Sequence, residues 1–135
     1  MATWADLAAY VHDTYDVISE KEDEIRILFN FEQFDEDDER TQVIILVREV
    51  LDRQHEWVQI ASPIGLAADV DLKAFLTEVG NSTIACGAAI MGDHVVLRHS
   101  LPLSHLDIHE FTEPLALLAG TADRLEETFF GGDEY

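Results

Sequence analysis

The run of five apolar residues from Val43 to Val47 constrains the fold most, because any strand that it forms is apolar on both faces. Successive side chains of a strand point to opposite faces of a sheet, so both faces of this strand need cover. We predict that Val43, Ile45 and Val47 meet the helices and that Ile44 and Leu46 point the other way. Either another element of the chain covers this outer pair, or a partner molecule does.

The spacing of apolar residues elsewhere predicts an α+β fold in the order α-β-β-β-α-β-β-α. Apolar residues three and four positions apart indicate helices over residues 3–16, 72–79 and 107–130. Alternating or β-rich segments indicate strands over residues 25–32, 41–51, 57–64, 82–91 and 94–101. Short links favour antiparallel neighbours, so we expect five strands in a twisted, mainly antiparallel sheet packed by the helices.

Capping residues mark the ends of the expected helices. Thr3 and Asp107 are the expected N-caps of the first and last helices, and Asp69 or Asp71 caps the middle one. Pro114 lacks an N–H, so the last helix is expected to bend or restart there. The predicted helix stops are Gly80-Asn81 and Gly131-Gly132.

Charged and turn-forming segments separate the expected strands. Residues 20–24 are expected to be a charged connection. Residues 35–40 are expected to be a polar turn, and they lack the ligand spacing of an EF-hand loop. Pro63 and Gly65 should end the third strand, and Gly92-Asp93 should turn the last hairpin.

The charge of the chain limits the partners that it can bind. There are 28 Asp and Glu residues against 8 Lys and Arg, a formal net charge of -20. Such a field repels phosphate groups, so we expect no binding to nucleic acid or to an anionic membrane. A basic partner or a salt-rich cytoplasm would each explain the acidity, and the two explanations are compatible.

The length of 135 residues suits one domain, expected to span residues 1–135. No apolar stretch approaches the roughly 20 residues that cross a bilayer, and residues 1–6 lack the pattern of a signal peptide. We therefore predict a cytoplasmic protein that folds by itself or with a copy of itself.

No residue pattern in the sequence indicates an active site, so we predict a protein that is not an enzyme and has no cofactor. Cys86 is the single cysteine and is expected to be a small core residue on a strand rather than a nucleophile. His105 and His109 have metal-ligand spacing on a helix, but two ligands do not close a zinc site. A small metal-dependent enzyme that uses this pair is the alternative from another class.

The short middle helix carries an apolar stripe that can pack on the sheet or against its own copy in a dimer. This stripe and the outer pair of the apolar strand exceed what a lone molecule of this size would comfortably bury. The predicted partner or dimer interface consists of Leu72, Phe75, Leu76, Val79, Ile44 and Leu46.

The segment from Val95 to Gly132 resembles the type III secretion chaperone-like group that includes the YbjN-like proteins. Val-Val-Leu-Arg-His-Ser-Leu-Pro-Leu leads there into a helix that carries Ala122-Asp123-Arg124-Leu125-Glu126. The expected element order is also similar to that of this group. The resemblance implies a twisted antiparallel sheet with packed helices, no catalytic residue, and a homodimer formed around the middle helix.

These observations predict a chaperone-like module that holds a segment of a partner protein on the apolar surface of its sheet. The alternative within the same fold is a regulatory adaptor that binds a folded partner. Both functions require an apolar surface that the chain itself leaves exposed.

Overall fold

The computed structural model describes residues 2–33, 40–83, 86–104 and 106–131, without the side chains of Gln33 and His109. Over these residues the strands are β1 (Asp16–Lys21), β2 (Glu24–Asn30), β3 (Thr41–Leu51), β4 (His55–Leu66), β5 (Gly87–Met91) and β6 (His94–Pro102). The α-helices are α1 (Trp4–Thr14), α2 (Leu72–Ser82) and α3 (Ile108–Phe130). Short 3-10 helices follow β2 and β4 at Phe31–Gln33 and Ala67–Asp69.

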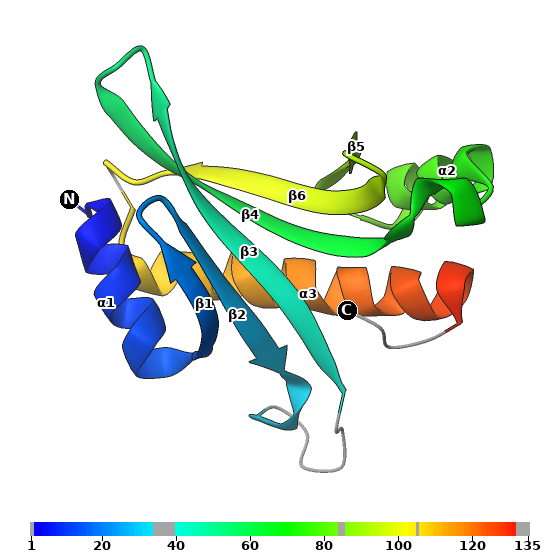
Figure 1. The fold of residues 1–135 in the computed structure, drawn as a ribbon, viewed down its shortest axis with the longest axis horizontal. Helices are drawn as coiled ribbons and strands as arrows, with labels where there is room; N and C mark the ends of the chain where they lie inside the picture. The colour runs from blue at the N-terminus through cyan, green and yellow to red at the C-terminus, as the bar shows by residue number, and fades with distance from the viewer. Residues whose placement is uncertain (1, 34–39, 84–85, 105, 132–135) are drawn as a thin grey trace.

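The strands form one sheet in the order β1-β2-β3-β4-β6-β5, with each neighbouring pair antiparallel (Figure 1). The predicted α+β class with an antiparallel sheet is therefore confirmed. The described part of the sheet has six strands rather than the expected five. Residues 20–24, expected to be a connection, instead hold the end of β1 and the turn into β2. The predicted turn at residues 35–40 lies outside the described residues, apart from Arg40.

The two edges of the sheet differ in charge and regularity. Edge strand β1 carries Asp16, Glu20 and Lys21, and its register with β2 shifts between Val17 and Ser19. Edge strand β5 has the sequence Gly-Ala-Ala-Ile-Met, with no charged residue and no shift against β6. Charges and bulges discourage an edge strand from pairing with a further strand. Only β1 is protected in this way.

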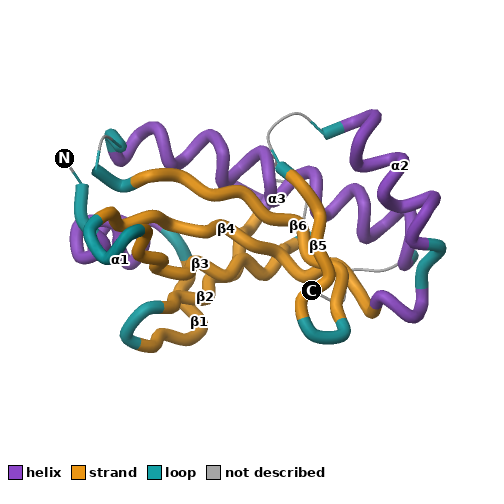
Figure 2. Tube along the Cα trace, turned by 90° about the horizontal axis from the view of Figure 1, so that it is seen from above, coloured by secondary structure: helices purple, strands orange, loops and turns teal. Residues whose placement is uncertain are grey.

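The helices cover one face of the sheet. Figure 1 shows α3 running across that face, with α1 beside one of its ends and α2 beside the other. Helix α3 contacts β3, β4 and β6, the central strands. In Figure 2, α3 lies on one side of the sheet and the turns of the β1–β2 and β5–β6 hairpins lie on the other. We call the face turned away from α3 the open face.

The core lies between the helices and the even-numbered residues at the centre of β3. Ile44 and Leu46 are 0 % exposed, and they pair with Ile27 and Ile25 of β2, which are buried as well. The prediction that this pair points away from the helices is therefore wrong. The odd-numbered members of the run lie on the open face instead. The register with β2 decides the orientation, because the run itself is equally apolar on both sides.

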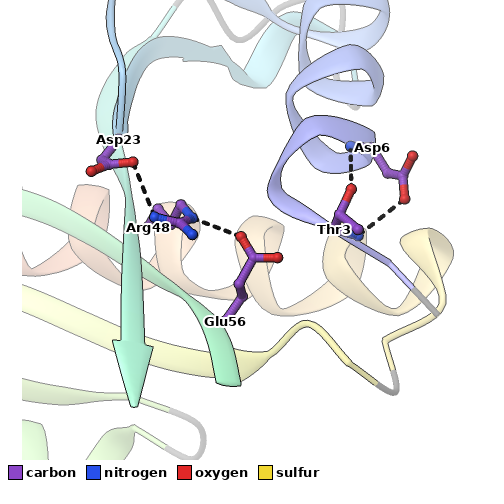
Figure 3. A network of polar contacts seen from close by, with 5 residues as sticks. All are labelled: Thr3, Asp6, Asp23, Arg48 and Glu56. Carbon is purple, nitrogen blue, oxygen red and sulfur yellow. Dashed lines mark hydrogen bonds and ion pairs between the residues drawn. The ribbon is translucent and has the colours of Figure 1, made fainter. Parts of the chain in front are cut away.

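The predicted caps of the first two helices are present. The backbone N–H of Asp6 donates to Thr3 Oγ1 at 3.2 Å, and the N–H of Thr3 donates to Asp6 Oδ2 at 3.0 Å (Figure 3). Asp71 rather than Asp69 caps α2, since its carboxylate accepts an N–H of the first turn at 3.2 Å. Helix α3 is continuous through Pro114 and does not restart there.

Two predicted element boundaries are wrong. Strand β4 continues through Pro63 and Gly65, where it was expected to end. Its pairing with β3 stops at Ala61, so β6 is the one neighbour paired with Pro63 and the missing N–H is tolerated. Helix α2 extends to Ser82, so β5 begins only at Gly87.

Two turns depend on glycine in the left-handed region of backbone space. Gly92 has a φ of 66° in the β5–β6 turn, as the predicted hairpin requires. Gly131 has a φ of 70°, and its N–H donates to the carbonyls of Glu126 and Glu127 at 3.1 and 3.2 Å. Gly131 thus ends α3 as predicted, whereas Gly132 lies outside the described residues.

Candidate functional site

A groove with a volume of about 560 Å³ crosses the open face. Its lining residues come from every strand of the sheet, with Ile18 of β1 near one end and Met91 of β5 near the other. The apolar centre of the groove consists of Val43, Ile45, Val47, Ala61, Pro63 and Val96. The hairpin turns seen on this side of the sheet in Figure 2 belong to strands that line the two ends.

The apolar centre follows from the strand registers. Ile45 pairs with Arg26 of β2 on one side and with Ala61 of β4 on the other, so the three side chains share the open face. Pro63 pairs with Val96 of β6 and extends the apolar row toward β5.

The polar groups beside the groove contact one another. Arg26 Nε donates to Glu24 Oε2 at 3.1 Å, so the two charged side chains among the described lining residues form an ion pair. Gln59 is buried, and its Nε2 donates to Glu49 Oε1 at 2.9 Å. The groove therefore combines an apolar centre with polar groups that are already paired.

Arg48 fixes the β1–β2 turn against β3 and β4. Its backbone N–H donates to the carbonyl of Asp23 in the turn at 2.8 Å, and its side chain contacts the carboxylate of Asp23 at 3.4 Å. Arg48 Nε donates to Glu56 Oε2 at 2.6 Å, and this hydrogen bond raises the pKa of Arg48 (Figure 3). The hairpin that flanks one end of the groove is thus held in place.

A second apolar surface lies where α2 meets β5. A hollow of about 120 Å³ is lined there by Leu72, Leu76, Ala88, Ala89, Ile90 and Val95. Leu76 and Ile90 are 52 % and 54 % exposed. The other two residues of the predicted helical stripe, Phe75 and Val79, are buried, and the Phe75 ring contacts the Phe129 ring with centroids 5.2 Å apart. The predicted interface residues therefore divide between this surface, which we call the α2–β5 patch, and the core.

The residues considered for catalysis are not brought together in the described part of the chain. His105 and the side chain of His109 lie outside it. Across the described residues, no group of three or more His, Cys, Asp or Glu side chains could hold a metal ion. Cys86 packs against the core just before β5, not on a strand as predicted, and burial raises the pKa of its thiol. A raised pKa lowers the thiolate fraction and hence the nucleophilicity of a cysteine.

The segment Ala122-Asp123-Arg124-Leu125-Glu126 lies on α3, where Asp123 forms an ion pair. Asp123 is buried on α3, and its Oδ2 lies 2.8 Å from Arg40 Nη1. Arg40 precedes β3 and also contacts Glu127 at 3.0 Å. These ion pairs join the C-terminal half of α3 to the start of β3.

No described helix has the length and apolar content that a membrane span needs. No protein-family profile matches the chain, and no curated protein matches it. Among solved structures, a chain of the HopA1-SchA chaperone-effector complex is similar, with a TM-score of 0.58 at 12% identity over 90% of this chain and 88% of that chain. The likeness shows a shared fold over nearly the whole chain.

Sequence reasoning missed most residues of the groove. It assigned the odd-numbered residues of β3 to the helix side and gave no role to Ala61 or Val96. The sequence feature that pointed to the groove was the run that is apolar on both faces. This run predicts that one face of the strand is left uncovered by the helices, but it does not say which face. Ala61 and Val96 enter the groove through pairing between strands that are distant in sequence, which no local pattern reveals.

Proposed function

We propose that this protein is a chaperone-like binding module that holds a segment of a partner protein in the groove on the open face. The single observation that carries the proposal is an apolar groove across a sheet face that no described helix covers. Exposed apolar surface of this kind marks interaction sites. The fold shared with a chain from a chaperone-effector complex supports the same class of function.

An amphipathic helix is the form of bound segment that best satisfies its own backbone hydrogen bonds. Strands of the sheet form their hydrogen bonds within its plane, so an extended segment lying on its face would leave N–H and C=O groups without partners. A helix satisfies these groups internally and presents one apolar stripe. A width of six strands corresponds to about 24 Å, which matches a helix of about 16 residues.

The α2–β5 patch supports a proposed homodimer, in which Leu72 and Leu76 meet their copies. Its centre is apolar, and the adjacent edge strand β5 has no charge that would repel a second chain. A two-fold axis beside β5 would bring the same patch of both copies together. Phe75 and Val79 support the patch from beneath.

A model helix of about 16 residues, with a leucine stripe and an uncharged polar face, is expected to bind the protein and shift the amide NMR signals of β3 and β4. Replacing both Ile45→Thr and Val47→Thr should weaken binding at least about tenfold, since each buried methylene contributes about 0.8 kcal/mol. Thr keeps the β-branched shape that strands favour. Fluorescence anisotropy of the labelled peptide measures the affinity.

Leu117→Gln is the matched control for this experiment. Leu117 is an exposed apolar residue of α3, away from the groove. The control should leave the peptide affinity unchanged within about twofold. Equal losses in the groove variant and the control, or no binding at all, would contradict the proposed site.

The proposed dimer predicts a mass that depends on salt. Two copies that each carry a charge of -20 repel at low ionic strength, and screening at about 1 M salt reduces the Debye length to about 3 Å. The dimer fraction in light scattering should therefore rise with salt. Leu76→Asp should give a monomer under all conditions, whereas Leu117→Asp should not change the mass. If the unmodified protein has a monomeric mass at every protein and salt concentration, the proposed dimer is contradicted.

A further inference from the structure

We propose that the helix held in the groove carries one carboxylate at the border of its apolar stripe, and that this carboxylate pairs with Arg98 of β6. The inference rests on the proposed function and names the chemistry of the partner. It is carried by an arginine on the open face that has no partner among the described residues, in a chain rich in carboxylates.

Arg98 lies on the open face beside the apolar centre of the groove. It pairs with Ala61 of β4 and follows Val96 by two residues on β6, so the three side chains share one face of the sheet. Ala61 and Val96 line the groove, and Arg98 is half-buried next to them. Arg98 therefore borders the place where a bound helix would lie.

Arg98 differs from the other arginines of the described strands and helices in having no carboxylate partner. Arg26, Arg48 and Arg124 each contact a glutamate, at 3.1, 2.6 and 3.3 Å. The Arg98 side chain forms no hydrogen bond or ion pair with any described residue. Because the chain has 28 acidic residues against 8 basic ones, an arginine without a carboxylate partner calls for an explanation.

The strand registers place no carboxylate next to Arg98. Its nearest neighbours on the open face are Ala61 and Gly87 on the adjacent strands, and Val96 and Ser100 on β6 itself. A Cβ atom at Gly87 would meet no atom within 4 Å, so the space above this glycine is open. A group from a partner therefore has room beside Arg98.

The acidic residues that the described strands direct to the open face already have partners there. The three pairs are Asp16 with Asn30, Glu24 with Arg26, and Glu49 with Gln59. The basic residues of this face are Lys21, Arg26 and Arg98, so acids and bases balance on its strands, against 28 to 8 in the whole chain. A partner carboxylate thus meets less repulsion on this face than on the rest of the chain.

Burial by the partner makes the charge of Arg98 decisive. A helix in the groove would exclude water from Arg98, and a guanidinium that loses water without gaining a partner weakens the complex. A carboxylate at the border of the apolar stripe would instead accept charge-assisted hydrogen bonds from it. The net charge of -20 repels a strongly acidic segment from a distance, so the matching helix is nearly neutral and has its carboxylate at this one position.

The test uses model helices that share a leucine stripe and a glutamine face and differ in one residue. Four border peptides carry a single glutamate at either border of the stripe, near either end, to allow for both directions of the bound helix. A fifth peptide carries the glutamate at the centre of the polar face, and a sixth has no glutamate. At least one border peptide should bind at least about tenfold more tightly than the fifth, as measured by fluorescence anisotropy.

Substitutions of Arg98 test the residue itself. Arg98→Gln should reduce the preference for the best border peptide to within about twofold, without weakening the peptide that has no glutamate. Arg98→Glu should reverse the preference, so that lysine at the same border position binds at least about fivefold more tightly than glutamate. Lys73→Gln is the control, because it removes one positive charge at an exposed position of α2, and it should retain the preference.

The outcomes separate this inference from the proposed function. If the peptide without glutamate binds but no border position is preferred, the carboxylate pairing is overturned and the groove remains the binding site. If the preference survives Arg98→Gln, or is lost equally in Lys73→Gln, Arg98 is not the residue that pairs with the carboxylate. If none of the peptides binds, the proposed function itself is overturned.

Discussion

Ile44→Ala is expected to lower the free energy of unfolding by about 3 kcal/mol, whereas Ile45→Ala should lower it by less than about 1 kcal/mol. Ile44 is fully buried beneath the helices, so its truncation leaves a cavity. Ile45 lies on the open face, where solvent or a partner fills the space. Urea unfolding of both variants measures the difference.

The comparison is sharp because the two residues are neighbours of the same type on one strand. Similar m-values for both variants would show that the same surface unfolds in each. Binding of the model helix should show the opposite order, with Ile45→Ala weakened and Ile44→Ala retained while it stays folded. Equal destabilisation by the two substitutions would contradict the assignment of the faces.

Gly65→Ala is expected to destabilise the protein by about 2 kcal/mol through overpacking. A Cβ atom on Gly65 would overlap the aromatic ring of Phe130, which lies directly on this glycine. The ring sits near the end of α3, so the contact joins that helix to β4. The backbone or the ring must shift to admit a methyl group.

Phe130→Ala should relieve this overlap. In a double-mutant cycle, Gly65→Ala should cost at least about 1 kcal/mol less when Phe130 is already truncated. Gly87→Ala is the control, because a Cβ at Gly87 meets no atom within 4 Å, and it should change stability by less than about 0.5 kcal/mol. Additive effects of Gly65→Ala and Phe130→Ala would mean that the ring does not limit the space.

Local chemistry made much of the fold predictable from the sequence. The hydroxyl of Thr3 and the carboxylate of Asp71 cap their helices because each can accept an N–H that the first turn leaves unpaired. Gly92 and Gly131 were identifiable because positive φ angles cost other residues more. Such features depend on residues a few positions apart, so one sequence contains the necessary information.

Strand β1 was missed because it is an edge strand. Its side chains are exposed except for a half-buried Val17, so the alternation that marks a half-buried strand is absent. The charges at Glu20 and Lys21, which suggested a connection, protect the edge instead. Edge strands are therefore the elements for which periodicity is least informative.

The sequence was sufficient to predict an apolar binding surface on the sheet but not the residues that form it. A run that is apolar on both faces implies that one face lies in the core and that the other is an apolar surface that a partner can bury. Which face is which depends on pairing with Ile25 and Ile27, and hence on a register that the run does not encode. The prediction therefore found the strand and reversed its sides.

The unequal edges of the sheet limit how copies of the chain can assemble. A sheet that offers two receptive edges can add molecules head to tail without end, which leads to fibres. Here β1 has charges and a shifted register, which disfavour pairing with a further strand. The edge strand that could pair with another copy is therefore β5. An antiparallel β5–β5 contact uses the same edge of both molecules, so assembly along the sheet would close at two chains.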